Sequence, residues 1–119
     1  MNQSSDRKIY DLEERTSLYA TNVRDYLKTL PKSISNIEYA KQLVRSSGSV
    51  AANYIEANES LGKKDFEMKI KICRKVAKES RLWLDLAEST EAYRQTRQSL
   101  IAESTELIKI FSSILKNAR

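Results

Sequence analysis

Residues 42–86 read QLVRSSGSVAANYIEANESLGKKDFEMKIKICRKVAKESRLWLDL, and they contain two helical patterns separated by Gly62. Before this glycine, apolar side chains recur three and four residues apart, as at Val50 and Tyr54. After it the same spacing continues, as at Ile70 and Cys73. Such spacing places the apolar side chains on one face of an α-helix. The stretch therefore predicts two amphipathic helices joined by a short link.

The same periodicity extends to both sides of this stretch. Upstream it runs from Ile9 to Leu30 and stops at Pro31, because the residue before a proline is biased away from helix. Downstream, residues 93–114 carry a near-heptad apolar seam. The predicted helices span about residues 6–29, 36–59, 65–88 and 91–116.

Local signals mark where the two central helices begin and end. Ser35 followed by Glu38 matches a capping box and predicts the start of the second helix. Gly62 predicts a left-handed stop at its end, and Asp65 is a good N-cap for the third helix. These signals leave only short links between neighbouring helices.

Length and composition favour one helical domain over residues 1–119. A chain of 119 residues is about one domain long, and it holds only two glycines and one proline. Sheets and loop-rich folds need more turn residues. Because short links force neighbouring helices to be antiparallel, we expect an all-α, antiparallel up-down-up-down four-helix bundle.

Composition also excludes several classes of function. The chain has no histidine, which removes the usual general base and the commonest zinc ligand. Cys73 is the single cysteine, so no internal disulfide calls for an oxidising compartment. No apolar run has the length of a signal peptide or a membrane span. We expect a cytoplasmic protein that is not an enzyme, with no catalytic residues, no metal, no cofactor and no membrane contact.

Basic side chains form a ridge on the predicted third helix. The chain carries 21 basic and 16 acidic residues, a net charge of +5 that draws nucleic acid or acidic partners. At 100° per residue the ridge covers one side of the helix and could follow a phosphate backbone. The alternative is an ordinary solvated face, because Glu67 and Asp85 interrupt the ridge. The candidate nucleic-acid-binding residues are Lys64, Lys71, Arg74, Lys75, Lys78 and Arg81.

The predicted second helix carries a stretch of small residues and a polar stripe. Residues 46–52 read SSGSVAA, and small side chains in mid-helix allow close packing within or between subunits, or the approach of a ligand. The stripe lies opposite the apolar face, where it meets water, another subunit or a ligand; the functional alternative to plain solvation is a contact surface at an oligomer interface or a pore. Its members are Arg45, Ser49, Asn53 and Glu56.

A second apolar row, Ile72, Val76 and Trp83, lies beside the main apolar stripe of the third helix. An apolar face of this width indicates burial on two sides. Trp83 is therefore a candidate interface anchor, because large aromatic side chains supply much of the buried area at protein contacts. The alternative is that Trp83 closes one end of the monomer core.

The stretch from Gln42 to Leu86 resembles the 23S ribosomal RNA intervening-sequence protein family, a bacterial four-helix-bundle family. The resemblance rests on a recurring order of short motifs, with Leu27 to Lys32 similar to the first turn of the family. The matching positions here are Arg45, Ser49-Val50, Ala52-Asn53, Glu56-Ala57, Lys64-Asp65-Phe66, Lys78-Glu79 and Trp83-Leu84.

This resemblance implies a left-handed up-down bundle that assembles as a ring-like homopentamer. The family is related to the accessory protein of diversity-generating retroelements, which binds nucleic acid and a reverse transcriptase through a basic surface. Two hypotheses follow. The first is a non-enzymatic oligomeric bundle that binds RNA or DNA through the ridge. The second is a scaffold for self-assembly or for a protein partner that binds no nucleic acid.

Overall fold

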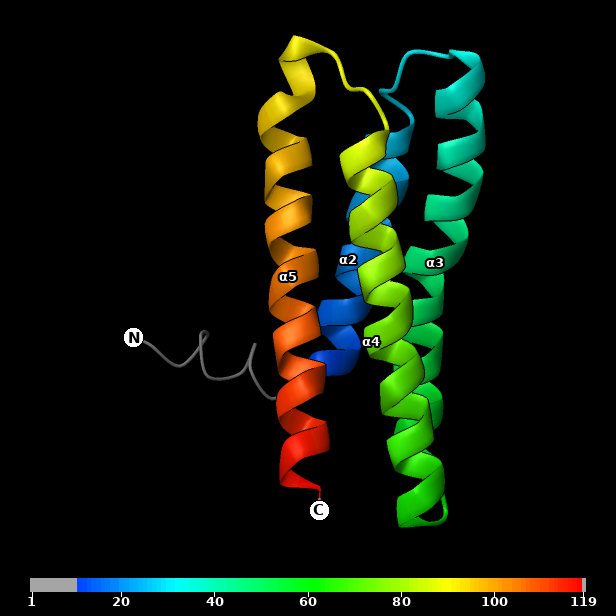
Figure 1. The fold of residues 1–119 in the computed structure, drawn as a ribbon, viewed down its shortest axis with the longest axis vertical. Helices are drawn as coiled ribbons and strands as arrows, with labels where there is room; N and C mark the ends of the chain where they lie inside the picture. The colour runs from blue at the N-terminus through cyan, green and yellow to red at the C-terminus, as the bar shows by residue number, and fades with distance from the viewer. Residues whose placement is uncertain (1–10, 119) are drawn as a thin grey trace.

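Four long α-helices make up most of residues 11–118, the part of the chain that the computed structural model describes. They are α2 (Leu12–Leu27), α3 (Ile34–Asn58), α4 (Lys63–Leu86) and α5 (Arg94–Asn117), and a single 3-10 turn, η1 (Glu91–Tyr93), precedes α5. Successive helices run in opposite directions along the long axis (Figure 1). The predicted all-α, antiparallel up-down-up-down bundle is confirmed.

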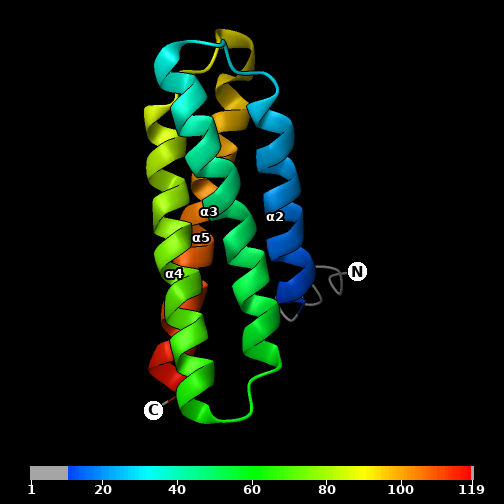
Figure 2. The same cartoon turned by 90° about the vertical axis from the view of Figure 1, so that its right-hand side faces the viewer.

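Each helix packs beside the helix that follows it in the chain, and the first and last helices close the bundle. α3 packs against both α2 and α4, and α4 packs against α5 (Figure 2). The contact between α2 and α5 is the least extensive of the four. The closing seam of the bundle is therefore its most open one.

The two central helices begin at other residues than the local sequence signals predict. Ser33, not Ser35, caps α3, because its Oγ accepts a hydrogen bond from the backbone N–H of Asn36 at 3.1 Å. Gly62 precedes α4 with an extended backbone, φ −144°, so the predicted left-handed stop is wrong. Asp65 lies in the first turn of α4, where an acid favours the positive end of the helix dipole.

The outer helices also begin or end away from the predicted positions. α2 ends at Leu27, three residues before Leu30, and α5 starts at Arg94 after the 3-10 turn. Asp11 caps α2 by accepting a hydrogen bond from the backbone N–H of Glu14 at 3.2 Å. The predicted first turn from residue 6 lies outside the described residues.

Buried apolar side chains form a single core between the four helices. Its largest fully buried members come from all four helices and include Tyr19, Leu43, Ile70 and Phe111. Two hydroxyl pairs cross this core: Tyr19 Oη lies 2.6 Å from Ser104 Oγ, and Ser46 Oγ lies 2.7 Å from Ser80 Oγ. Since a buried polar group needs a partner, these pairs favour one register of the helices.

Polar side chains also hold the end of the bundle where two loops meet. The buried Asn36 amide donates to the carbonyl oxygens of Pro31 at 3.0 Å and Glu88 at 2.9 Å, and accepts from the N–H of Glu88 at 2.9 Å. Arg97 donates to the carbonyl oxygens of Leu84 and Asp85 at the end of α4. The α2–α3 link is thereby joined to the α4–α5 link.

Candidate functional site

The structure divides the predicted basic ridge into two parts. Arg74 and Arg81 are half-buried and turn towards α5, where their guanidinium groups donate to Ser112 Oγ at 3.3 Å and Thr105 Oγ1 at 3.2 Å. They stabilise the α4–α5 seam and do not belong to an exposed ridge. Of the six predicted site residues, only the four lysines therefore remain as candidates for binding nucleic acid.

These four lysines form what we call the outer lysine row: Lys64, Lys71, Lys75 and Lys78. All four are exposed, and none forms an ion pair with any of residues 11–118. At 100° per residue they fall within an arc of about 60° on the side of α4 away from the core. The row is about 21 Å long at 1.5 Å per residue. It is a line of unpaired positive charge on a rigid helix.

The polar stripe of α3 lies along the edge that faces α4. Asn53 Nδ2 donates to the carbonyl oxygen of Ser49 at 2.9 Å and to its Oγ at 3.1 Å, and both residues are half-buried. Glu56 pairs with Lys69 of α4 at 2.8 Å, and this hydrogen bond raises the pKa of Lys69. Arg45 is exposed and forms no ion pair within the described chain. The structure thus joins Asn53 to Ser49 within α3, and it joins Glu56 to Lys69 of α4.

Lys69 is a residue that the sequence patterns did not single out. It lies on the opposite side of α4 from the outer lysine row, and its partner Glu56 is 13 residues away on another helix. The periodicity of either helix gives no signal for such a pair. Only the way α3 and α4 face each other creates it.

Trp83 packs at the α3–α4 edge of the core. Its ring stacks on Tyr39 of α3 with centroids 5.9 Å apart and planes at 26°, and both side chains are half-buried. The α3–α4 pairing therefore accounts for one face of Trp83. Leu86, one turn further along α4, is exposed.

An apolar row covers the outside of α3. Ile37, Val44, Gly48 and Ile55 lie within about 40° of one another around the helix, and we call them the α3 outer row. The three large side chains are 43–48% exposed. A Cβ built on Gly48 would meet nothing within 4 Å, so no packing against the rest of residues 11–118 requires this glycine.

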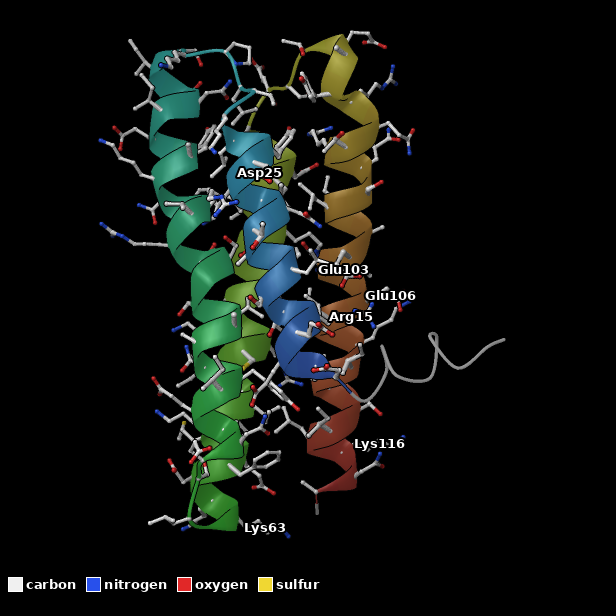
Figure 3. All side chains as sticks on the ribbon, turned by 180° about the vertical axis from the view of Figure 1, so that it is seen from behind. Arg15, Asp25, Lys63, Glu103, Glu106 and Lys116 are labelled. Carbon is white, nitrogen blue, oxygen red and sulfur yellow. The ribbon has the colours of Figure 1, made fainter. Side chains whose placement is uncertain are left out.

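A groove follows the seam between α2 and α5. It consists of two adjoining hollows of about 230 and 280 Å³ that share Asn22, Ser99 and Leu100. At one end Arg15 of α2 pairs with Glu103 of α5 through two contacts of 2.7 and 2.8 Å (Figure 3). This hydrogen bond to Glu103 raises the pKa of Arg15. We call this feature the α2–α5 groove.

Residues 11–118 contain neither a cluster of metal ligands nor a helix that could span a membrane. Within this range no group of three or more acidic or cysteine side chains is placed to hold a metal ion. No helix in this range has the length and apolar character needed to cross a bilayer.

Comparisons with known proteins agree with this architecture. The family described as 23S rRNA-intervening sequence protein matches residues 10–113. A crystal structure at 1.70 Å resolution of a protein of unknown function from the S23 ribosomal protein family, from Bacteroides thetaiotaomicron VPI-5482, is similar, with a TM-score of 0.75 and 30% identity. The match covers 87% of this chain and 97% of that one, whereas a search of curated proteins finds no match. The chain therefore belongs to the 23S rRNA-intervening sequence protein family.

Proposed function

We propose that the protein is a non-enzymatic, self-assembling bundle that binds RNA or DNA through the outer lysine row. The observation that carries this proposal is the exposure of four lysines on one side of α4 with no ion pair inside the described chain. Lysines arranged in this way neutralise phosphates and release counterions, which favours binding without dependence on sequence. A cytoplasmic location, where RNA and DNA are accessible, completes the proposal.

The neighbouring charges leave the row positive. Glu67 is half-buried beside it, and Glu79 is the exposed acid on its other flank. Neither forms an ion pair with a lysine of the row. The whole chain adds a net charge of +5, which steers a polyanion towards the protein.

The self-assembly half of the proposal is supported by the α3 outer row. A glycine in a helix interior costs about 1 kcal/mol relative to alanine, and the described residues make no contact that offsets this cost at Gly48. A second copy of the chain packed on α3 would use the small residue and cover Ile37, Val44 and Ile55. The resemblance implies a homopentamer, and five copies of 13.7 kDa have a mass of about 69 kDa.

Charge-reversal variants test the proposed binding of nucleic acid by the outer lysine row. In the row variant, Lys71, Lys75 and Lys78 are each changed to Glu, and in the control variant Lys28, Lys41 and Lys116 are changed instead. All six lysines are exposed, so both variants should fold and carry the same net charge. We expect the row variant to lose salt-sensitive binding to a structured RNA, as measured by fluorescence anisotropy. Equal loss in both variants would reject the row as the site.

Measuring the mass of the protein by light scattering tests the proposed self-assembly. We expect an oligomer for the wild-type chain and a monomer for Gly48→Leu, because a leucine on the α3 outer row would block the approach of a second copy. The same change should make the monomer about 1 kcal/mol more stable, since it replaces a helix-interior glycine. A monomeric wild type at micromolar concentration would reject self-assembly.

The α3 outer row also favours a second candidate, a scaffold for self-assembly or a protein partner that binds no nucleic acid. Its exposed apolar side chains suit a protein surface better than a phosphate backbone. An oligomer that ignores RNA at low salt would favour this candidate over the first.

A further inference from the structure

Resting on the proposed binding by the outer lysine row, we infer that its ligand is double-stranded nucleic acid, held by its phosphates without recognition of bases. Three features of α4 and its surroundings support this inference. They are the anchored helix that carries the row, the absence of an exposed aromatic side chain on α4 itself, and the placement of Arg74 and Arg81.

The row lies along one long helix that is anchored in the bundle. α4 spans 24 residues between α3 and α5, and its buried residues anchor it along its length. A duplex is stiff over about 150 base pairs and presents one phosphate charge per roughly 1.7 Å of axis, so about 12 phosphates lie along a 21 Å row. A single strand presents about half as many charges per unit length, and it loses conformational freedom when it is straightened. The row therefore suits the duplex.

Within the part of the chain that the structure describes, no aromatic platform lies beside the row. Proteins that bind single strands stack successive bases on aromatic side chains, which offsets the cost of ordering the strand. On α4, Phe66 is half-buried on the core side and Trp83 is stacked on Tyr39. Among residues 11–118, Tyr93 is the one exposed aromatic, and it lies in η1 and not on α4. Single strands would gain phosphate contacts here and little else.

The two arginines of α4, the side chains of this helix best suited to contact base edges, point towards α5. Arginine contacts guanine edges through two parallel hydrogen bonds, whereas lysine acts as a flexible point charge. Arg74 and Arg81 donate to Ser112 and Thr105 of α5. The positive charges left on the outside of α4 are those of lysines, so we expect binding that is insensitive to base sequence.

The test compares ligands of equal length on the intact protein. Fluorescence anisotropy would measure binding of a 24-base-pair DNA duplex, an RNA duplex of the same sequence, the separated strands, and a scrambled duplex. We expect either duplex to bind at least about tenfold more tightly than its strands, and the scrambled duplex to bind within about twofold. For the DNA duplex the slope of log K against log salt should be about −3.6 if each lysine neutralises one phosphate.

The row and control variants separate the failure of this inference from that of the proposed function. If single strands bind as tightly as duplexes, and only the row variant loses this binding, the duplex inference is overturned. The proposed function would then still stand. Binding of neither form, or equal loss in both variants, would overturn both. Strong dependence on base sequence would contradict phosphate-only recognition.

Discussion

The α3–α4 seam and the α2–α5 seam close the same bundle in different ways. α3 and α4 are joined by a short link and meet along most of their length through the Ser46–Ser80 pair and the Tyr39–Trp83 stack. α2 and α5 have no direct link, and the α2–α5 groove runs between them. Arg15–Glu103 and Tyr19–Ser104 are the polar contacts that hold the second seam.

This difference indicates where the fold opens first. Local opening favours regions with few buried apolar contacts, and α2, with 16 residues, is the shortest of the four helices. The α3 outer row and the outer lysine row lie on the outer sides of α3 and α4, so both proposed surfaces belong to the two helices that form the tighter seam. We therefore expect α2 to move without disturbing either surface.

The largest expected effect is the protection of Cys73 from chemical labelling. This residue lies in the α3–α4 seam. It is fully buried, and burial raises the pKa of its thiol to about 12. We expect labelling by a thiol reagent to be at least about a thousandfold slower in the folded than in the unfolded protein, because domain stabilities are about 5 kcal/mol or more. Rapid labelling under native conditions would show that the α3–α4 seam opens as readily as the other one.

The Cys73 thiol also makes the free energy of unfolding depend on pH. An unfolded thiol has an ordinary pKa near 9, so above that pH the unfolded state loses a proton that the folded state keeps. This contribution to stability is complete below about pH 9 and is lost as the pH rises towards about 12. Urea unfolding at several alkaline pH values would measure it, with Cys73→Ala as the control that lacks the thiol.

Truncation of one large side chain at each seam should lower the free energy of unfolding by different amounts. Ile70 is fully buried in α4, and we expect Ile70→Ala to lower the free energy of unfolding by about 4 kcal/mol. Leu100 already borders both hollows of the α2–α5 groove, so Leu100→Ala should cost about 2 kcal/mol. Urea unfolding of the two variants measures both values. A larger cost at Leu100 would contradict the view that the α2–α5 seam is the looser one.

Removal of the Arg15–Glu103 pair should loosen the α2–α5 seam selectively. The two side chains are 25% and 29% exposed, so we expect Arg15→Met to cost only about 1 kcal/mol. Amide hydrogen exchange should quicken in α2 and stay unchanged in α3 and α4. A double-mutant cycle with Glu103→Gln isolates the pair energy, and equal acceleration in all four helices would indicate that the seams open together.

The smallest effects come from two tyrosine hydroxyls of α2. Tyr19→Phe removes the hydrogen bond to Ser104 and should cost about 1 kcal/mol. Tyr26 is equally buried, but its hydroxyl has no hydrogen-bond partner within the described chain. Tyr26→Phe should therefore leave the free energy of unfolding within about 0.5 kcal/mol of wild type, or raise it. Chemical unfolding measures both, and equal costs would show that Tyr26 Oη is satisfied in solution.

Residue patterns predicted much of the fold and less of the candidate site. The alternation of apolar residues around Val50 and Ile70 identified both central helices, because it repeats with the helical period. The start of α3 was missed because Ser33 and Ser35 are both good caps, and backbone geometry decides between them. The nucleic-acid role of the lysines and the assembly of the chain stay predictions.

The ridge shows why the site was harder to predict. Arg74 and Arg81 lie about 60–80° from the core direction of α4, at the boundary between buried and exposed positions. A single helix does not reveal which neighbour lies at that boundary. Ser112 and Thr105, which accept their hydrogen bonds, are 38 and 24 residues further along the chain.

By itself the sequence determined the all-α class, the four helices and the family, because helical periodicity and family motifs are properties of residues near one another in the chain. Only the tertiary structure decided which charges stay in water, that Glu56 meets Lys69, and that the α2–α5 seam is the open one. Those outcomes depend on how the helices are rotated against one another. Side chains distant in sequence set that rotation by packing together in one core.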